Sequence, residues 1–333
     1  MTDKKKILSG NRPTGNLHLG HLVGILENWA SLQDDYHCFF EVADWHVLTT
    51  AQHNLPAMDR NIREMVAGWL STGIDPEKSV IFMQSQVPEH AELHLLLSMI
   101  TTVSRLERNP TYKEQLEELD LERGVSYGLL GYPVLQAADI LIYRASAVPI
   151  GQDQLPHLEL TREIARRFNH LFDEVFYEPE PLLTRVPKLA GTDGRKMSNS
   201  YDNAIYISDT KEEIREKVKQ MVTDPGRVRL KDKGTPEVCS IYDYHHVFNN
   251  PGFYQQVGPA CRQAEIGCTE CKERLASTLD QHLAPIRDRR ARLLADGDRI
   301  DEILRAGTIK ARREAGETME LVRDVMKIYR PGS

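Results

Sequence analysis

The sequence has no apolar run long enough to cross a membrane. None of its hydrophobic stretches approaches the roughly 18 residues of a membrane span, and the start MTDKKKILSG is basic without the apolar stretch of a signal peptide. Internal repeats and low-complexity segments are also missing. These absences favour a cytoplasmic globular protein. Its 333 residues, 41% hydrophobic and 27% charged, allow two domains and a substantial core.

The sequence also lacks an excess of positive charge. Its 42 lysine and arginine residues are outnumbered by 49 aspartate and glutamate residues, which gives a formal net charge of −7. This balance argues against a general polyanion binder, so any contact with nucleic acid must use a local basic surface. Two runs of basic residues could form such a surface: Arg287, Arg289, Arg290 and Arg292, and Lys310, Arg312 and Arg313. Helical runs of this kind are more often solvated faces.

The pattern of apolar residues predicts an α/β domain followed by helices. Short apolar runs at 7–9, 38–43 and 80–84 alternate with helical patterns at 20–34, 57–72 and 90–103. This alternation is typical of βαβ units and hence of a parallel, Rossmann-like sheet that binds nucleotides at the carboxyl ends of its strands. Further helices are expected at 111–123, 132–143, 153–170, 211–222, 257–282, 285–295, 299–306 and 308–329.

We expect three parts along the chain. Residues 1–190 form the α/β domain, which includes a connecting helical segment at about 104–130. Strands become scarce after about residue 190, so residues 191–307 are expected to form an all-helical domain. Residues 308–333 are expected to form a last helix that can return to pack on the first domain.

The segment GNRPTGNLHLGH at residues 10–21 has the composition of a nucleotide-binding loop. Gly10 and Gly15 permit sharp turns, and Gly20 lets a flat ring such as adenine lie against the backbone. His18 and His21 are three residues apart at the start of an apolar-periodic helix, so they share one face of an N-terminus that favours phosphates. The alternative is two histidines on a solvated helix start. Nucleotidylyltransferases also carry such a tetrapeptide.

A second loop, KMSNS at residues 196–200, follows GTDG and is a polar arm that can close on the outer phosphates of a nucleotide. It begins roughly 180 residues after the HLGH tetrapeptide at residues 18–21. An HLGH-type motif followed at this distance by a KMSKS-type loop resembles the motif order of class I aminoacyl-tRNA synthetases.

The resemblance becomes specific in GYPVLQAADILIY at 131–143 and VPIGQDQLPHLELTREIARRFN at 148–169, which look like the amino-acid pocket of tryptophanyl-tRNA synthetases. It extends over nearly the whole chain through SGNRPTG, VADWH, SRLERNPTYK and VPKLAGTDGRKMSNS. It implies a ligase that activates L-tryptophan with ATP to tryptophanyl-adenylate and pyrophosphate, and then transfers tryptophan to the 3′ end of tRNA(Trp). It also implies a helical domain that reads the anticodon and a homodimer formed through the first domain.

The same resemblance assigns the tryptophan pocket. Asp139 accepts the indole N–H, while Tyr132 and Gln154 hold the substrate ammonium. Leu8 stands where tyrosyl enzymes commonly have a tyrosine, which favours indole as the substrate ring. Gln136 stands where many bacterial relatives have methionine, so it either contacts the indole edge or supports Asp139. The alternative for Asp139 is a helix-capping or structural carboxylate.

The resemblance also implies ATP with Mg²⁺, which accompanies the nucleotide rather than occupying a protein cage. His18 and His21 hold the triphosphate, and Asp153 holds the ribose hydroxyls. Lys113 and Lys196 contact the phosphates as charge builds on pyrophosphate. The full ATP-binding set implied is Arg12, Thr14, Gly15, His18, Gly20, His21, Gly151, Asp153, Lys196, Met197, Ser198 and Ser200.

Two positions in these loops depart from the family. Asn199 stands where KMSKS has its second lysine, which removes one cation from the loop and predicts slower activation. Arg12 stands where some relatives have glutamine, and it could meet the substrate carboxylate or a phosphate.

Four of the five cysteines are grouped as C-x21-C-x6-C-x2-C, at Cys239, Cys261, Cys268 and Cys271, while Cys38 is expected in the core. Grouped thiols in a cytoplasmic protein indicate a metal site rather than disulfides, and from spacing alone Zn²⁺ leads. A subset of bacterial tryptophanyl-tRNA synthetases resembles this chain in such cysteines and binds a [4Fe–4S] cluster there, so the resemblance favours the cluster over zinc. Free cysteines are the third alternative.

Two other classes of function compete with the ligase. One is an RNA-binding or regulatory paralogue that keeps the fold without efficient activation, and Asn199 is the feature that favours it. The other is a small-molecule nucleotidylyltransferase, which shares the first motif. It does not explain the C-terminal helices, the YPVLQAAD segment or the four cysteines.

Overall fold

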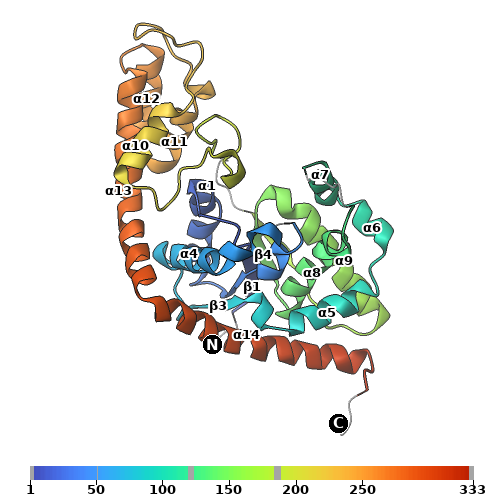
Figure 1. Ribbon diagram of the computed structural model, residues 1–333. Helices are drawn as coiled ribbons and strands as arrows, with labels where there is room; N and C mark the ends of the chain where they lie inside the picture. Colours follow the sequence, from blue (N-terminus) through green and yellow to red (C-terminus); the bar gives the residue numbers. More distant parts are fainter. Residues whose placement is uncertain (1–3, 51, 119–123, 184–188, 330–333) are drawn as a thin grey trace.

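A five-stranded parallel sheet forms the centre of the protein (Figure 1). The structure is a computed structural model that describes residues 4–50, 52–118, 124–183 and 189–329. The strands lie in the order β3-β2-β1-β4-β5, so the order reverses between β1 and β4. Their bounds are Lys6–Asn11 for β1, His37–Val42 for β2, Ser79–Met83 for β3, Ala147–Ile150 for β4 and Glu180–Leu183 for β5. The predicted parallel α/β sheet is confirmed.

Helices cover both faces of this sheet, which is why the central strands are apolar without alternation. One face packs on α2 (Glu27–Leu32) and α4 (Met58–Ser71), where Trp29 lies 4.5 Å from Phe40, measured between ring centroids. Cys38 is fully buried on this face, in the core as expected. The other face packs on α5 (Glu89–Ser98), α8 (Tyr127–Ile142) and α9 (Leu155–Leu171).

Several shorter elements connect these layers. The predicted helix at 20–34 is built from a single α-turn, one π-helical stretch and a second α-helix, and the predicted helix at 90–103 ends earlier, at Ser98. The predicted helix at 111–123 is described only to residue 118. The short elements are α1 (Leu19–His21), α3 (Asp44–Val47), α6 (Val103–Glu107) and α7 (Pro110–Glu118), the π-helix Leu22–Leu26, and 3₁₀ turns at Gln52–Ala57, Gln84–Gln86, Gln152–Gln154, Asn199–Tyr201 and Pro236–Val238.

Helices dominate the rest of the chain, as expected, but three predicted boundaries were wrong. The predicted helix at 257–282 is interrupted between α12 and α13, and α13 runs through Pro285 without a break. The predicted helices at 299–306 and 308–329 are one continuous helix, α14. The bounds are Lys211–Gln220 for α10, Ser240–Phe248 for α11, Pro251–Arg262 for α12, Cys268–Ala295 for α13 and Gly297–Val325 for α14.

The last helix covers an edge of the sheet. Figure 1 shows α14 running beneath β3, the strand at one end of the sheet, toward α5. Gly307 makes the closest approach, since a Cβ added there would lie 1.8 Å from the backbone oxygen of Ile81 in β3. A salt bridge of 2.5 Å between Lys6 and Glu314 fixes the helix further along. An edge strand left uncovered would offer unpaired backbone groups to another chain, so this packing protects the sheet.

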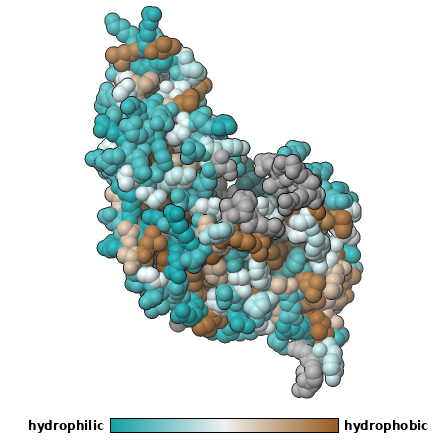
Figure 2. Space-filling view, viewed as in Figure 1, coloured by the Kyte–Doolittle hydropathy of each residue, from teal (hydrophilic) through white to brown (hydrophobic). Residues whose placement is uncertain are grey.

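The surface of the helical part has the polar character of a surface that faces water. Figure 2 shows that the elongated part formed by α10 to α13 is mostly hydrophilic on the face in view. Within the residues that the structure describes, no helix combines the length and the hydropathy that crossing a bilayer requires.

Candidate active site

The two predicted nucleotide loops lie against each other, although they are far apart in the sequence. Backbone hydrogen bonds join the first loop to the strand-like segment that follows the second loop, from the Leu19 N–H to the Ile205 oxygen at 2.9 Å and from the Ile207 N–H to the Leu17 oxygen at 3.0 Å. The first loop follows the carboxyl end of β1, which borders the point where the strand order reverses. Open α/β sheets bind ligands at such a point.

His18 and His21 lie where the two loops meet. Their rings stack with centroids 3.7 Å apart, and the His18 backbone N–H donates to His21 Nδ1 at 3.2 Å. Burial, with smaller effects of His21 and Lys196, lowers the pKa of His18 to about 3, and burial lowers the pKa of His21 to about 4. Both rings are therefore neutral at pH 7 and present N–H donors rather than charges.

The second loop closes over the first. The positive charge of Lys196 contributes to the lowered pKa of His18, which places the two side chains near each other. Met197 is buried, and its sulfur would lie 4.0 Å from a Cβ added to Gly20. The Ser198 backbone N–H donates to Asn203 Oδ1 at 2.9 Å, which fixes the loop from below. The side chain of Ser200 lies outside the described part.

Asn199, the residue that departs from the family pattern, contacts the first loop directly. Its Nδ2 donates to the Asn16 backbone oxygen at 3.2 Å. It also lies over Gly15, whose φ of +152° and whose missing Cβ leave room, since a Cβ there would be 2.9 Å from Asn199 Nδ2. Thr14 precedes this glycine in a tight turn, where its N–H donates to the Arg12 oxygen at 2.8 Å.

Gly151, Asp153 and Gln154 follow the carboxyl end of β4, on the other side of the reversal point. A Cβ on Gly151 would lie 2.7 Å from Asp153 Oδ1, and Gln154 Nε2 donates to Asp153 Oδ2 at 3.3 Å. All three residues are exposed or half-buried. The sheet therefore brings the β4 segment and the two loops to one edge.

Asp139 lies deep beneath this edge and accepts hydrogen bonds from three side chains. The donors are His46 Nε2 at 2.8 Å, His90 Nδ1 at 2.6 Å and Gln84 Nε2, which is 2.9 Å from each carboxylate oxygen. His90 Nε2 in turn pairs with the Tyr143 hydroxyl at 2.7 Å. Burial alone would raise the pKa of Asp139, but the hydrogen bonds from His46 and His90 outweigh it and hold that pKa well below the ordinary value.

A second carboxyl group, Glu41, belongs to the same buried cluster. Atoms of Glu41, His46 and Asp139 that could ligate a metal lie within 4.8 Å of one another. The His46–Asp139 hydrogen bond already joins two of these atoms, so the cluster is a hydrogen-bonded network as it stands. Burial, followed by the neighbouring charge of Asp139, raises the pKa of Glu41 well above its usual range, which favours the neutral form of this carboxyl group.

The other predicted pocket residues lie on helices around this network. Tyr132, Gln136 and Asp139 share one face of α8, and the Tyr132 hydroxyl lies 3.2 Å from His157 Nε2 on α9. Gln136 is half-buried, whereas Leu8 is buried in the core below. The remaining predicted residue, Lys113, is exposed on α7.

The sequence analysis assigned no role to five side chains of this region: Glu41, His46, Gln84, His90 and His157. His46 lies in the VADWH segment that carried the family resemblance. Glu41 had a local signal, because it is the one acid in the apolar strand HCFFEV. The others gave no sign, since polar residues in helical segments are ordinary.

Of the four grouped cysteines, Cys239 directly precedes α11, Cys261 lies in α12, and Cys268 and Cys271 lie in the first turn of α13. Burial, followed by the charges of Cys239, Cys261 and Cys268, raises the pKa of the Cys271 thiol to about 12. Mutual effects of this kind require the four sulfurs to be neighbours. The His245 ring lies 3.3 Å from the Cys271 sulfur.

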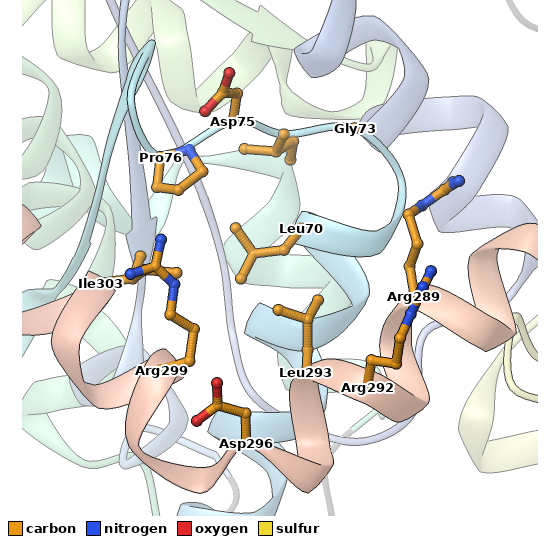
Figure 3. A pocket seen from close by; sticks show the side chains of 11 residues that line it. Leu70, Gly73, Asp75, Pro76, Arg289, Arg292, Leu293, Asp296, Arg299 and Ile303 are labelled. Atoms are coloured by element: carbon orange, nitrogen blue, oxygen red, sulfur yellow. The ribbon is translucent and has the colours of Figure 1, made fainter.

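The first basic run is largely used in contacts within the protein, whereas Lys310, Arg312 and Arg313 of the second run are exposed. Arg287 pairs with Asp280, Arg290 pairs with Glu64 on α4, and Arg289 Nε donates to the Ser71 backbone oxygen at 2.7 Å. A cavity of about 530 Å³ lies where α13 and α14 meet the end of α4 (Figure 3). Its lining includes three arginines and two aspartates but no predicted site residue: Leu70, Gly73, Ile74, Asp75, Pro76, Arg289, Arg292, Leu293, Asp296, Arg299 and Ile303.

Comparison with known proteins gives a consistent result. Residues 1–284 match the family described as class I tRNA synthetases (W and Y). A tryptophan–tRNA ligase of Thermotoga maritima is 53% identical over 325 residues, covering 97% of this chain and 99% of that protein, and one of Aquifex aeolicus is 43% identical, covering 97% and 100%. A solved tryptophanyl-tRNA synthetase from Campylobacter jejuni, complexed with ADP and tryptophan, superimposes with a TM-score of 0.87 at 32% identity, covering 97% of this chain and 100% of that one.

Proposed function

Since the chain belongs to the class I tRNA synthetases for tryptophan and tyrosine, we propose that it activates L-tryptophan with ATP and transfers it to the 3′ end of tRNA(Trp). The observation that carries this proposal is the meeting of the HLGH and KMSNS loops at the reversal point of the sheet. Tryptophan rather than tyrosine is supported by the relatives, which are tryptophan–tRNA ligases that match this chain over nearly their whole length. Leu8 supports the same choice.

Activation is the in-line attack of the tryptophan carboxylate on the α-phosphorus of ATP, which releases pyrophosphate. The nucleophile is already ionised, so the step needs positioning and charge stabilisation rather than a general base. The neutral rings of His18 and His21 donate hydrogen bonds to the triphosphate, and Lys196 and Lys113 offset the charge that builds on pyrophosphate. Mg²⁺ accompanies ATP on its phosphates.

We propose that the buried network around Asp139 recognises the indole N–H. A buried hydrogen-bonding group left without a partner is costly in these low-dielectric surroundings. A substrate ring without an N–H in the right place is therefore rejected. Tyr132 and Gln154 hold the substrate ammonium, and Asp153 holds the ribose. Arg12 lies near Tyr132, where it can meet the substrate carboxylate.

Amino-acid-dependent exchange of labelled pyrophosphate into ATP tests the proposal. We expect exchange with tryptophan, and exchange with tyrosine lower by about 10⁴-fold, because the network pairs an N–H at the indole position. Tyrosine-dependent exchange at a similar rate would overturn the pocket assignment and leave the class intact. Exchange with neither amino acid would favour a paralogue without activation. The protein should be purified without oxygen, so that oxidised cysteines do not account for a loss.

We further propose that Cys239, Cys261, Cys268 and Cys271 hold a [4Fe–4S] cluster. The choice of the cluster over Zn²⁺ rests on the resemblance of these cysteines to those of the cluster-binding subset of bacterial tryptophanyl-tRNA synthetases, since spacing alone favours zinc. Neighbouring thiolates repel one another, so these thiols need a cationic centre to lose their protons. Either a [4Fe–4S] cluster or Zn²⁺ would supply that centre. Arg227, 3.5 Å from the Cys261 sulfur, would hydrogen-bond to a sulfur of either.

Anaerobic purification distinguishes the two groups. We expect a brown protein with broad visible absorption and with iron and acid-labile sulfide in equal amounts. A Cys268→Ser variant should lose most of both, while a Cys38→Ser variant, altered in the core, should retain them. Stoichiometric zinc without visible absorption would instead identify a zinc site. Metal-free protein would indicate free cysteines.

We also propose a homodimer formed through the α/β domain and a tRNA(Trp) anticodon site on the helices between residues 191 and 307. The dimer is supported by Leu95, Met99 and Val103, large apolar side chains exposed by 55%, 67% and 56%. Leu95 and Met99 lie one turn apart at the end of α5, and Val103 is the first residue of α6. An apolar strip of this kind is typical of a surface that another chain covers.

A further inference from the structure

His245 is a buried histidine on α11 that lies against the group of cysteines. Its Nε2 is 3.3 Å from the Cys271 sulfur and 3.2 Å from the Cys271 backbone oxygen. The ring of Phe253 in α12 packs near it, with the two ring centroids 5.2 Å apart. The position of the ring proton decides what this side chain can do, since an Nε2 with a proton donates to the sulfur, whereas a bare Nε2 could itself bind a metal.

The surrounding hydrogen bonds place the proton on Nε2. A carbonyl oxygen can only accept, so the contact with the Cys271 oxygen requires an N–H at Nε2. At the other end of the ring, Asn249 Nδ2 donates to His245 Nδ1 at 2.7 Å, so Nδ1 is the acceptor. The Thr278 hydroxyl donates to Asn249 Oδ1 at 3.1 Å, which fixes that amide in the required orientation. His245 is therefore a donor directed at Cys271 rather than a fifth metal ligand.

The Cys271 oxygen alone does not account for this donor. Because α13 runs from Cys268 to Ala295, that oxygen also accepts the backbone N–H of Leu275, four residues further on. The Cys271 sulfur lies almost as close to Nε2 as the oxygen does, but a protonated thiol is a weak acceptor. A thiolate is a stronger acceptor, because a hydrogen bond to a charged sulfur is charge-assisted. The donor is thus best used when Cys271 has lost its proton, as it must to bind a metal.

We propose that His245 is a positioning residue of the cysteine site, whose Nε2–H hydrogen-bonds to the Cys271 sulfur when that sulfur is a thiolate bound to metal. This inference rests on the metal site proposed above for the four cysteines, and deepens it. His245 orients the ligand and offsets its charge, and its complete burial strengthens the bond by excluding water. If the site holds a [4Fe–4S] cluster, the same bond favours the reduced state, because reduction adds negative charge next to the N–H.

Two substitutions of His245 separate the hydrogen bond from the packing of the ring. His245→Phe keeps a ring of similar size without a donor, whereas His245→Gln places an amide N–H at a reach close to that of Nε2. We expect anaerobically purified H245F to lose its metal to a chelator about 10- to 100-fold faster than wild type, and H245Q to recover most of this difference. His246→Phe is the matched control, because the neighbouring His246 packs on Tyr254 and should leave the loss rate unchanged.

The reduction potential of the cluster gives a readout that ring packing alone would not move. We expect this potential to be lower in H245F than in wild type, because the reduced state has lost a hydrogen bond, and to lie close to wild type in H245Q. Equal loss rates and equal potentials in wild type and a folded H245F would overturn the inference. Equally fast metal loss from H245Q and H245F would also overturn it, since the ring would then matter only for packing. For a site that holds zinc, the loss rates of these variants decide alone.

A measurement on wild type covers the case in which H245F does not fold. Pulsed electron paramagnetic resonance of the reduced cluster should show a weak nitrogen coupling that changes when the histidines are labelled with nitrogen-15. Absence of a histidine coupling would overturn the inference. Anaerobically purified protein without metal would overturn it together with the metal site, whereas failure of tryptophan-dependent exchange would contradict only the proposed ligase activity.

Discussion

A Gly307→Ala substitution is expected to lower the free energy of unfolding by about 3 kcal/mol, a large effect for one added methyl group. The new Cβ would lie 1.8 Å from the backbone oxygen and 2.7 Å from the carbonyl carbon of Ile81. Backbone atoms of a central parallel sheet cannot move aside as a flexible side chain could. The variant must therefore separate α14 from β3, which exposes part of the core that both share.

Gly316→Ala in the same helix is the matched control. A Cβ added there meets nothing within 4 Å, so alanine should raise stability by about 0.5–1 kcal/mol through its higher helix propensity. Urea unfolding of the two variants at one protein concentration measures the difference. Similar changes in both variants, in either direction, would mean that α14 does not contact β3 as closely as described.

The same glycine explains why the sequence misplaced a helix boundary. The helices predicted at 299–306 and 308–329 leave Gly307 between them, and glycine often follows a helix end. In the structure α14 continues through it, and the missing Cβ serves close packing on β3 instead. The boundary predicted between the helices at 257–282 and 285–295 is wrong in the same way, since α13 continues through Pro285. Both choices depend on neighbours that are distant in the sequence.

Most of the fold and of the nucleotide loops could be predicted, because their signals are local. Apolar runs of strand length gave β1, β2 and β3 within a few residues, and the glycines and histidines of the first loop lie within 12 positions of one another. The network around Asp139 could not be predicted. His46, Gln84 and His90 come from three segments that only the sheet and α5 bring together, and Asp139 is 49 residues or more from each of them.

Replacing Lys196 with alanine is expected to slow tryptophan-dependent formation of the adenylate about 10²- to 10³-fold, with little change in KM for tryptophan. Asn199 supplies an amide where the family pattern has a second lysine, and that amide already donates to Asn16. Arg195 is held by Asp193 at 2.7 Å and lies over the Tyr201 ring. Lys196 is therefore the cation of this loop that is best placed to offset the charge on pyrophosphate.

The Lys196→Arg and Arg195→Ala variants test that assignment. Arginine keeps the charge at a changed reach, so Lys196→Arg should recover a part of the rate. Arg195→Ala removes a charge of the same sign one residue away and should cost less than Lys196→Ala. Pre-steady-state measurement of adenylate formation isolates the step, because it precedes transfer to tRNA. Equal losses in the two alanine variants would show that the total positive charge of the loop matters rather than the position of Lys196 near His18.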